Sequence, residues 1–145
     1  MTVTVAGLDG SVRKLSSETI DEFRELLRGR VLRPGDPGLR DSREVFNAMY
    51  PSNPGLTVLP SGTADVVQAV LFARQHSLLL AVRGGGHSVA GFSAGDAGFL
   101  IDLSPLSAVL VDRERRLVHV QGGALWGDVD RETQQFGLAA PGGNV

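Results

Sequence analysis

A run of small and polar residues carries the clearest chemical signal in the chain. An apolar stretch, residues 78–82, leads directly into Arg83, Gly84, Gly85, Gly86, His87 and Ser88. Because glycine has no side chain, its backbone N–H group can approach a ligand closely and its φ angle can be positive, so such a loop can cradle an anion. The natural ligand is a diphosphate, and His87 could act beside it as a base, a ligand or a nucleophile. The alternative is a tight structural turn.

The standard motifs of other nucleotide-binding and hydrolytic sites do not fit. A dinucleotide fingerprint starting at Gly84 would require glycine at position 89, where Val89 stands. Residues 122–127 have the glycine spacing of a phosphate-binding P-loop, but Asp128 occupies the position of its lysine. Ser88 follows His87 directly, and neighbouring side chains of an extended chain point apart, which argues against a serine hydrolase.

The other histidines indicate structural roles. His76 falls at the end of a predicted helix, where capping is the favoured role, and His119 falls in a predicted hairpin strand, where a surface or packing role is expected. No two histidines have the spacing of helical metal ligands, and the chain has no cysteine. We therefore predict no metal site and no disulfide.

A βαβ unit is predicted to position the glycine loop. Its parts are a strand over residues 56–59, a turn, a helix over residues 63–76 and a strand over residues 78–82. A further strand is expected over residues 99–103, after a turn-rich segment at residues 91–98. The helix is expected to begin at Thr63 as its N-cap and to bury Val66, Val67, Val70 and Leu71.

Shorter elements are predicted on either side of this unit. Before it we expect a helix capped by Ser17 and ended by Gly29, a short strand at residues 31–32, and a second short helix over residues 39–48 with Val45 and Phe46 inward. After it we expect a β-hairpin of residues 109–111 and 117–121. A helix over residues 124–135 follows, with Gly137 as its stop and Trp126 packing in a core.

Composition narrows the class of protein. The 145 residues are 42% hydrophobic and 21% charged, which is typical of a globular α/β or α+β domain rather than a disordered chain. The net charge of -2 gives no basic field for nucleic acid. No apolar stretch reaches the length of a membrane span, and no signal peptide is recognisable, so we expect a cytoplasmic protein without nucleic-acid or membrane partners.

Together these motifs resemble one family. The chain is similar to flavoproteins with a PCMH-type (vanillyl-alcohol-oxidase-like) FAD-binding domain, specifically the berberine-bridge-enzyme-like FAD-linked oxidoreductases. The similar segments, in the expected order and spacing, are VFNAM (45–49), GTADV (62–66), RGGGHS (83–88), IDLS (101–104), QGGALWGDV (121–129) and PGG (141–143). The resemblance implies an α+β fold of two subdomains, the second incomplete, with an N-terminal extension containing one helix at residues 1–32 and the FAD-binding domain at residues 33–145.

The resemblance also implies a cofactor site for FAD. Its backbone contacts to the diphosphate would come from residues 84–88, and His87 would be bonded through its ring to the 8α-methyl carbon of the flavin. The full set of implied cofactor-binding residues is Arg83, Gly84, Gly85, Gly86, His87, Ser88, Leu59 and Pro60 beside the adenosine half, and Gly122, Pro141, Gly142 and Gly143 near the flavin. Relatives with a second flavin bond carry a cysteine where Val145 stands, so only one bond is expected here.

The family's enzymes continue beyond this length with a substrate domain that supplies the catalytic base. We therefore expect no catalytic residue in this chain, and a small-molecule substrate only if a C-terminal part completes it. The function expected from the resemblance is the FAD-binding part of a flavin-linked oxidoreductase. The alternatives are an inactive truncated remnant that binds FAD weakly or not at all, and a small anion-binding domain unrelated to flavins.

Overall fold

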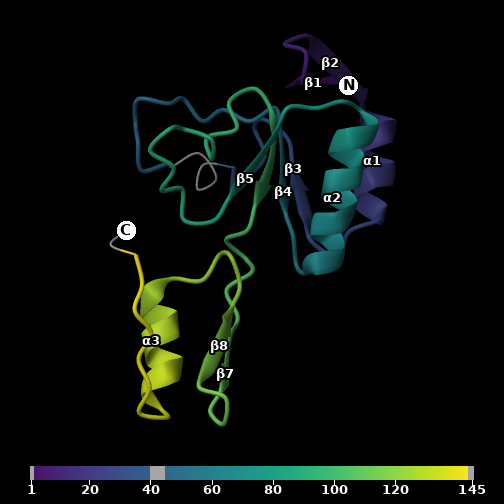
Figure 1. Cartoon of the computed structure of the whole chain (residues 1–145). Helices are drawn as coiled ribbons and strands as arrows, with labels where there is room; N and C mark the ends of the chain where they lie inside the picture. Colours follow the sequence, from purple (N-terminus) through teal and green to yellow (C-terminus); the bar gives the residue numbers. More distant parts are fainter. Residues whose placement is uncertain (1, 40–44, 144–145) are drawn as a thin grey trace.

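The computed structural model describes residues 2–39 and 45–143. They form two units, drawn one above the other in Figure 1. The elements are β1 (Thr2–Ala6), β2 (Val12–Ser16), α1 (Ser17–Glu25), β3 (Arg30–Leu32), β4 (Leu56–Leu59), α2 (Thr63–Gln75), β5 (Leu80–Arg83), β6 (Phe99–Asp102), β7 (Val109–Asp112), β8 (Leu117–Val120) and α3 (Trp126–Gln134).

The upper unit is built on a four-stranded sheet with the strand order β3-β4-β6-β5. Strands β4, β6 and β5 are parallel, and β3 pairs antiparallel with β4 at one edge. Helices α1 and α2 lie side by side on one side of this sheet (Figure 1). Between them and the sheet, the rings of Phe23 and Phe72 stack with centroids 4.0 Å apart, and Phe99 packs against both. The predicted βαβ unit is therefore present.

The hairpin that β1 and β2 form was not predicted. Its turn contains Gly10 at φ +77°, and the Asp9 carboxylate accepts a hydrogen bond from the Ser11 N–H at 3.1 Å. Val5 and Leu15, on its inner face, are buried in the same core as Phe23. A bridge between Gly7 and Leu78 joins the hairpin to the segment that precedes β5. The first 32 residues thus contribute to the core that supports the glycine loop.

Helix α2 buries a different face from the predicted one. Its buried residues are Asp65, Ala69, Phe72 and Ala73, whereas Val67, Val70 and Leu71 are 42–50% exposed. Contacts with other elements explain the difference. Phe72 stacks on Phe23, and the small alanines let the helix approach the sheet. The Asp65 carboxylate accepts hydrogen bonds from backbone N–H groups such as that of Gly29. The N-caps also differ by one residue, since Ser16 caps α1 and Gly62 precedes α2.

The predicted helix over residues 39–48 is not formed at residues 45–48, the part of it that the structure describes after residue 39. Residues 40–44 lie outside the described residues, and residues 45–50 form bends and turns. Asn47 explains this, because its side-chain oxygen accepts from the Met49 N–H at 3.1 Å and its carbonyl accepts from the Tyr50 N–H. An asparagine that binds nearby backbone donors in this way competes with helix formation.

The lower unit consists of the β7–β8 hairpin and α3. The predicted stop is confirmed: Gly137 has φ +65°, the Gly137 N–H donates to Gln134 and the Leu138 N–H to Thr133, as in a Schellman cap. Helix α3 begins at Trp126 rather than at residue 124. The Trp126 ring is 44% exposed, so the prediction that it packs in a core is wrong.

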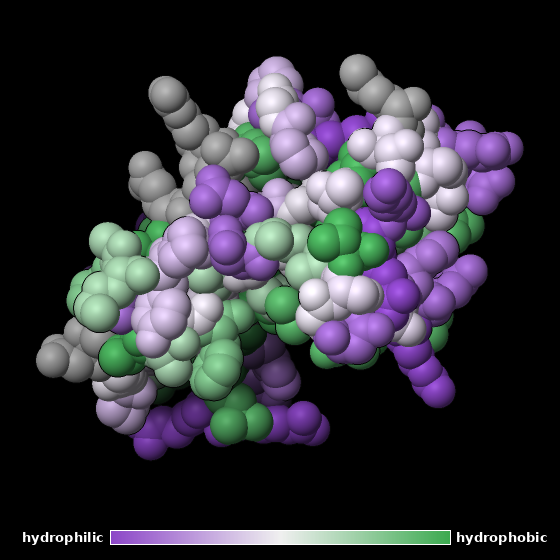
Figure 2. Space-filling view, turned by 90° about the horizontal axis from the view of Figure 1, so that it is seen from above, coloured by the Kyte–Doolittle hydropathy of each residue, from purple (hydrophilic) through white to green (hydrophobic). Residues whose placement is uncertain are grey.

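Large apolar side chains lie at the surface of both units. In the lower unit they include Leu110, Leu117 and Leu125, each more than half exposed. In the upper unit Phe46, Met49 and Phe92 are exposed by 66% or more. The view from above shows apolar residues gathered toward one side of the molecule (Figure 2). No helix within the described part of the chain is long and apolar enough to cross a membrane.

Candidate cofactor site

The carboxyl ends of three parallel strands meet at one edge of the sheet. The register pairs Arg83, the last residue of β5, with Asp102, the last residue of β6. Leu59 ends β4 one residue beyond the pair of Val58 with Ile101, so it lies level with them. Ligands of open α/β sheets bind at such an edge, and the glycine loop starts there.

The glycine loop, residues 84–88, has a row of available donors. Among hydrogen bonds between described residues, none uses the backbone N–H of any of these five residues as its donor. Gly86 has φ +73°, a conformation that favours glycine. Gly85 and His87 are exposed, Gly84 and Ser88 are half-buried and Gly86 is buried, so the loop is partly open to solvent. Such a row of N–H groups without acceptors among the described residues can bind an anion.

The imidazole of His87 lies over its own loop. A Cβ atom on Gly85 would come within 2.7 Å of the His87 Cδ2 atom, so the ring occupies the space that Gly85 leaves free. The Phe46 ring lies against it, with centroids 5.8 Å apart, and the Phe46 N–H donates to the Gly86 carbonyl at 3.1 Å. His87 is therefore exposed and held between an aromatic ring and the loop backbone.

Residues 46–50 contact the continuation of the loop at two further points. The Asn47 side-chain amide donates to the Val89 carbonyl at 2.9 Å, and the Tyr50 ring fills the space beside Gly91. Ser88 closes the following turn, since its hydroxyl oxygen accepts from the Phe92 N–H at 3.1 Å. Sequence reasoning did not assign Asn47 or Tyr50 to the site, although both lie within or beside the VFNAM segment.

Arg83 is predicted as a cofactor residue, yet its side chain is inside the protein. Its Nη2 atom lies 2.5 Å from Oδ2 of Asp102, and the two side chains are only 5% and 3% exposed. Asp102 was not among the predicted site residues. The signal available was an acidic residue at the end of an otherwise apolar strand, Phe99–Asp102, because such a residue needs a charged partner when buried.

Gly122 is brought to the glycine loop. A Cβ atom on Gly84 would overlap the Gly122 carbonyl oxygen, and one on Gly123 would overlap the Leu103 carbonyl oxygen. The segment that leads from β8 to α3 therefore crosses directly over the ends of β5 and β6. These glycines allow three stretches of backbone to touch.

The predicted adenosine contacts differ in exposure. Pro60 is fully buried, whereas Leu59 is half-buried. Next to them the Asp65 carboxylate accepts from the N–H groups of Gly29 at 2.9 Å, Ser61 at 2.8 Å and Arg28 at 3.1 Å, and from the Ser61 hydroxyl at 3.0 Å. Burial raises the pKa of Asp65, but these hydrogen bonds outweigh it, so the pKa lies below its ordinary value.

Pro141, Gly142 and Gly143 are exposed and follow the segment that runs back along α3 (Figure 1). Gly142 lies against the indole of Trp126, with no room for a Cβ atom. No hydrogen bond between described residues joins these three to the glycine loop. The structure thus brings Gly122 to the loop, and leaves Pro141 to Gly143 with α3.

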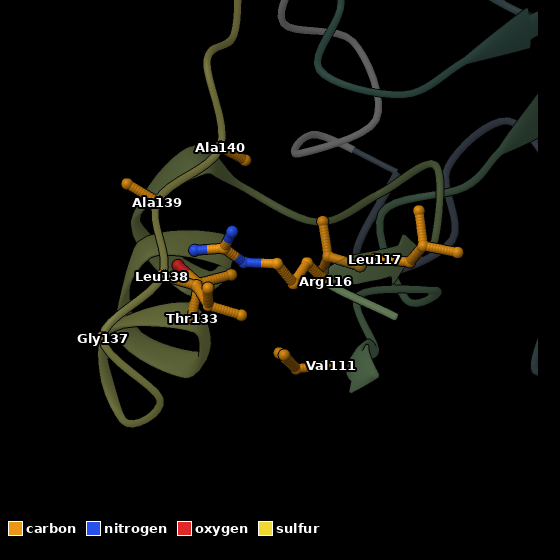
Figure 3. Close-up of a pocket in the computed structure, with 9 residues that line it drawn as sticks. Val111, Arg116, Leu117, Thr133, Gly137, Leu138, Ala139 and Ala140 are labelled. Carbon is orange, nitrogen blue, oxygen red and sulfur yellow. The ribbon is translucent and has the colours of Figure 1, made fainter. Parts of the chain in front are cut away.

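Two hollows accompany these elements. One of about 230 Å³ lies between the β7–β8 hairpin and the end of α3, and the Arg116 side chain reaches across it toward Leu138 (Figure 3). None of the predicted cofactor residues lines it. Another of about 400 Å³ lies beside β5, between Tyr50 and Phe92. Neither replaces the glycine loop as the candidate site.

Comparison with known proteins identifies the family. The family model of the FAD binding domain matches residues 54–144, more than half of the chain. The chain belongs to this FAD-binding domain family. Its cofactor is FAD, and the predicted α+β, PCMH-type fold is confirmed.

Individual relatives agree with this assignment. An FAD-linked oxidoreductase of Dictyostelium discoideum is 36% identical over 131 residues, which are 90% of this chain and 28% of that protein. The crystal structure of 6-hydroxy-D-nicotine oxidase from Arthrobacter nicotinovorans superposes with a TM-score of 0.74 and 29% identity, over 79% of this chain and 25% of that one. CrmK, a flavoenzyme of caerulomycin biosynthesis, superposes with a TM-score of 0.72 and 33% identity, over 79% of this chain and 24% of that one.

A BBE-like protein of Physcomitrella patens shares the fold, with a TM-score of 0.58 and 24% identity over 66% of this chain and 21% of that one. The resemblance to FAD-linked oxidoreductases that the motifs predicted is confirmed by the family model and by the Dictyostelium relative. The chain spans about a quarter of the length of these relatives. Its FAD-binding character is established at the level of the family.

Proposed function

We propose that residues 84–88 bind the diphosphate of FAD through their backbone N–H groups. The observation that carries this proposal is the row of five consecutive N–H groups without an acceptor among the described residues, at the carboxyl edge of a parallel sheet. A diphosphate offers several oxygens that accept from such donors at once. The cofactor fits because none of these N–H groups donates to another described residue and the loop is partly open to solvent at Gly85 and His87.

The remaining predicted residues would surround the two ends of FAD. Leu59 and the buried Pro60 would flank the adenosine from the end of β4, which is level with the loop. Gly122, in contact with Gly84, would approach the flavin half. Pro141, Gly142 and Gly143 would approach it from α3. These contacts rest on the family resemblance together with the shared sheet edge.

We also propose that His87 is the single point of covalent attachment. Its imidazole is exposed at the loop, where Phe46 restrains it, and the chain holds no cysteine for a second bond. The new C–N bond would replace a C–H bond of the 8α-methyl group and the N–H bond of the imidazole. Two protons would go to water, and the released electron pair would reduce the flavin, from which an oxidant such as dioxygen removes it.

The activity proposed for the whole protein is oxidation of a small molecule by hydride transfer to FAD, with this chain as the cofactor-binding part. The catalytic base and substrate contacts would lie outside it. The alternative is a chain that retains FAD weakly or not at all. The exposure of Leu110, Leu117 and Leu125 in the lower unit favours that alternative. An apolar surface left uncovered in water destabilises the unit that would contact the flavin.

Denaturing gel electrophoresis of the FAD-treated chain tests the covalent bond. The unmodified chain and His119→Ala, a control at an exposed histidine of β8, are expected to carry acid-stable flavin fluorescence. His87→Ala is expected to lose it while still binding FAD reversibly. Fluorescence that persists in His87→Ala would refute attachment at His87. Absence of FAD binding in all three proteins would favour the alternative.

A further inference from the structure

Phe46 and Asn47 hold the glycine loop from a distant part of the chain. The Phe46 N–H donates to the Gly86 carbonyl at 3.1 Å, and the Asn47 side-chain amide donates to the Val89 carbonyl, 42 residues away in the sequence, at 2.9 Å. Both hydrogen bonds end on carbonyl oxygens. The loop is therefore held through its acceptors, while the N–H groups of residues 84–88 donate to no described residue.

Three consecutive glycines need such support. Glycine has the widest choice of backbone conformations, so a loop of this composition takes one shape only where neighbouring groups impose it. Among hydrogen bonds between described residues, the one from Phe46 alone reaches a carbonyl of residues 84–86. The bonds from Gly91 and Phe92 close the turn that begins at Ser88, after the glycines. The hydrogen bond from Phe46 thus fixes the part of the loop that carries the predicted donors.

The side chain of Asn47 is itself fixed in orientation. Its oxygen accepts from the Met49 N–H at 3.1 Å, and the Asn47 carbonyl accepts from the Tyr50 N–H at 3.1 Å. Because the oxygen is bound within this turn, the side-chain nitrogen is directed at the Val89 carbonyl. The Tyr50 ring, in the same turn, fills the space beside Gly91. The turn at residues 47–50 and the end of the glycine loop are therefore joined at two places.

The ring of Phe46 restrains the His87 imidazole. The two ring centroids are 5.8 Å apart, and a Cβ atom on Gly85 would lie 2.7 Å from Cδ2 of the imidazole. The imidazole thus lies between the phenyl ring and the loop backbone. Phe46 and His87 are both exposed, and an exposed side chain ordinarily exchanges among rotamers, so contacts on two sides favour one of them. Phe46 therefore supports Gly86 with its N–H group and His87 with its ring.

We propose that Phe46 and Asn47 are positioning residues for the cofactor site. Asn47 and the Phe46 N–H keep the loop in the shape that leaves its donors free, and the Phe46 ring keeps the His87 imidazole in one orientation. This inference rests on the proposed diphosphate site at residues 84–88 and on the proposed attachment at His87. It differs from direct binding, because a residue that only contacts FAD has no effect on the loop before FAD arrives.

Amide chemical shifts of the FAD-free chain test the role of Asn47. Asn47→Ser and Asn47→Asp each keep an oxygen for the Met49 N–H, but neither side chain replaces the amide donor to the Val89 carbonyl. The N–H signals of residues 84–86 are expected to move in both variants. Ala48→Asp, which adds a charge at an exposed neighbouring position, is the control and should leave these signals unmoved. Unmoved loop signals in either folded Asn47 variant would overturn the role of Asn47.

FAD affinity gives the second measurement, in chains that also carry His87→Ala so that binding is reversible. Loss of the hydrogen bond from Asn47 should raise the dissociation constant for FAD about fivefold or more in Asn47→Ser and in Asn47→Asp. Ala48→Asp should stay within about twofold of the His87→Ala parent, since an exposed charge is screened. Weak binding without moved loop signals would identify Asn47 as a direct contact of FAD. Normal binding with moved signals would contradict a loop shape on which binding depends.

The three-bond couplings between the Hα and Hβ protons of His87 test the role of the Phe46 ring, because they report the χ1 rotamer. Phe46→Leu keeps the backbone bond to Gly86 and removes the aromatic ring. The couplings should be those of one rotamer in the unmodified chain and averaged in Phe46→Leu. Phe92→Leu is the matched control, because Phe92 also donates its N–H to the loop, at Ser88, but its side chain is 82% exposed. Averaged couplings in the unmodified chain, or one rotamer in Phe46→Leu, would overturn the role of the ring.

Acid-stable flavin fluorescence connects this orientation to attachment. With FAD and dioxygen present, Phe46→Leu should acquire the fluorescence at least about threefold more slowly than the unmodified chain, and Phe92→Leu at the same rate as the unmodified chain. Equal rates in Phe46→Leu and the unmodified chain would contradict the inference. If the unmodified chain binds no FAD, the proposed function fails, while moved loop signals and averaged His87 couplings in the FAD-free variants would still support the positioning roles.

Discussion

The Asp65 carboxylate offers the sharpest test of how the sheet edge is held together. Four donors converge on it from the segment before β3 and from the turn before α2. In Asp65→Asn the amide oxygen can take the place of Oδ2 and keep three donors, but the NH2 group then faces the Arg28 N–H. The variant loses one hydrogen bond to a charged group, worth about 1.5–3 kcal/mol, and weakens the other three.

We therefore expect Asp65→Asn to lower the free energy of unfolding by about 3 kcal/mol at pH 7. For a domain of this size that is a fall in the melting temperature of about 6–12 °C. Urea unfolding followed by circular dichroism measures the difference. Asp130→Asn, at an exposed position of α3, is the control and should unfold with the unmodified chain.

The difference in the free energy of unfolding between the unmodified chain and Asp65→Asn should become smaller as the pH falls. Because the pKa of Asp65 is lower in the folded chain than in the unfolded one, its contribution is complete above about pH 4. It declines as the pH falls through the lowered pKa, where protonation costs the folded chain these hydrogen bonds. A stability of Asp65→Asn equal to that of Asp130→Asn at pH 7, or a difference that stays constant into acid, would refute the reasoning.

Two glycine substitutions test contacts elsewhere in the site. Gly84→Ala places a Cβ atom on the Gly122 carbonyl, so it should cost about 1–3 kcal/mol of stability and weaken FAD binding, as read by urea unfolding and flavin fluorescence titration. Gly127→Ala, where a Cβ atom meets nothing, is its control. Gly142→Ala should displace the indole of Trp126, the one tryptophan of the chain, and shift its fluorescence emission, whereas Gly143→Ala should not. An unchanged emission in Gly142→Ala would contradict the packing described.

Local signals in the sequence were sufficient for the elements that surround the glycine loop. The apolar runs before and after α2, the glycines of residues 84–86 and the stop at Gly137 each have a local physical cause, and these features are present, whereas the helix predicted over residues 39–48 is not formed at residues 45–48. The β1–β2 hairpin had a signal as well, since Asp9 and Gly10 lie between alternating segments. It was missed because the strands are short and polar on one face.

Other features depend on residues far apart in the sequence. Which face of α2 is buried follows from Phe23 and from the backbone donors to Asp65, more than thirty residues away, and not from the spacing of its valines. The contact of Arg83 with Asp102 follows from the strand order, in which β6 lies beside β5. Periodicity within one segment does not contain this information.

The three glycines of the loop serve different purposes, although they look equivalent in the sequence. Gly84 makes room for another stretch of backbone, Gly85 makes room for the His87 ring, and Gly86 supplies a positive φ. A side chain at Gly84 therefore disturbs mainly the fold, because it displaces the Gly122 backbone. A side chain at Gly85 acts first on His87, whose ring can rotate away. Substitutions in the loop should thus separate FAD retention from covalent attachment, with Gly85 affecting mainly the attachment.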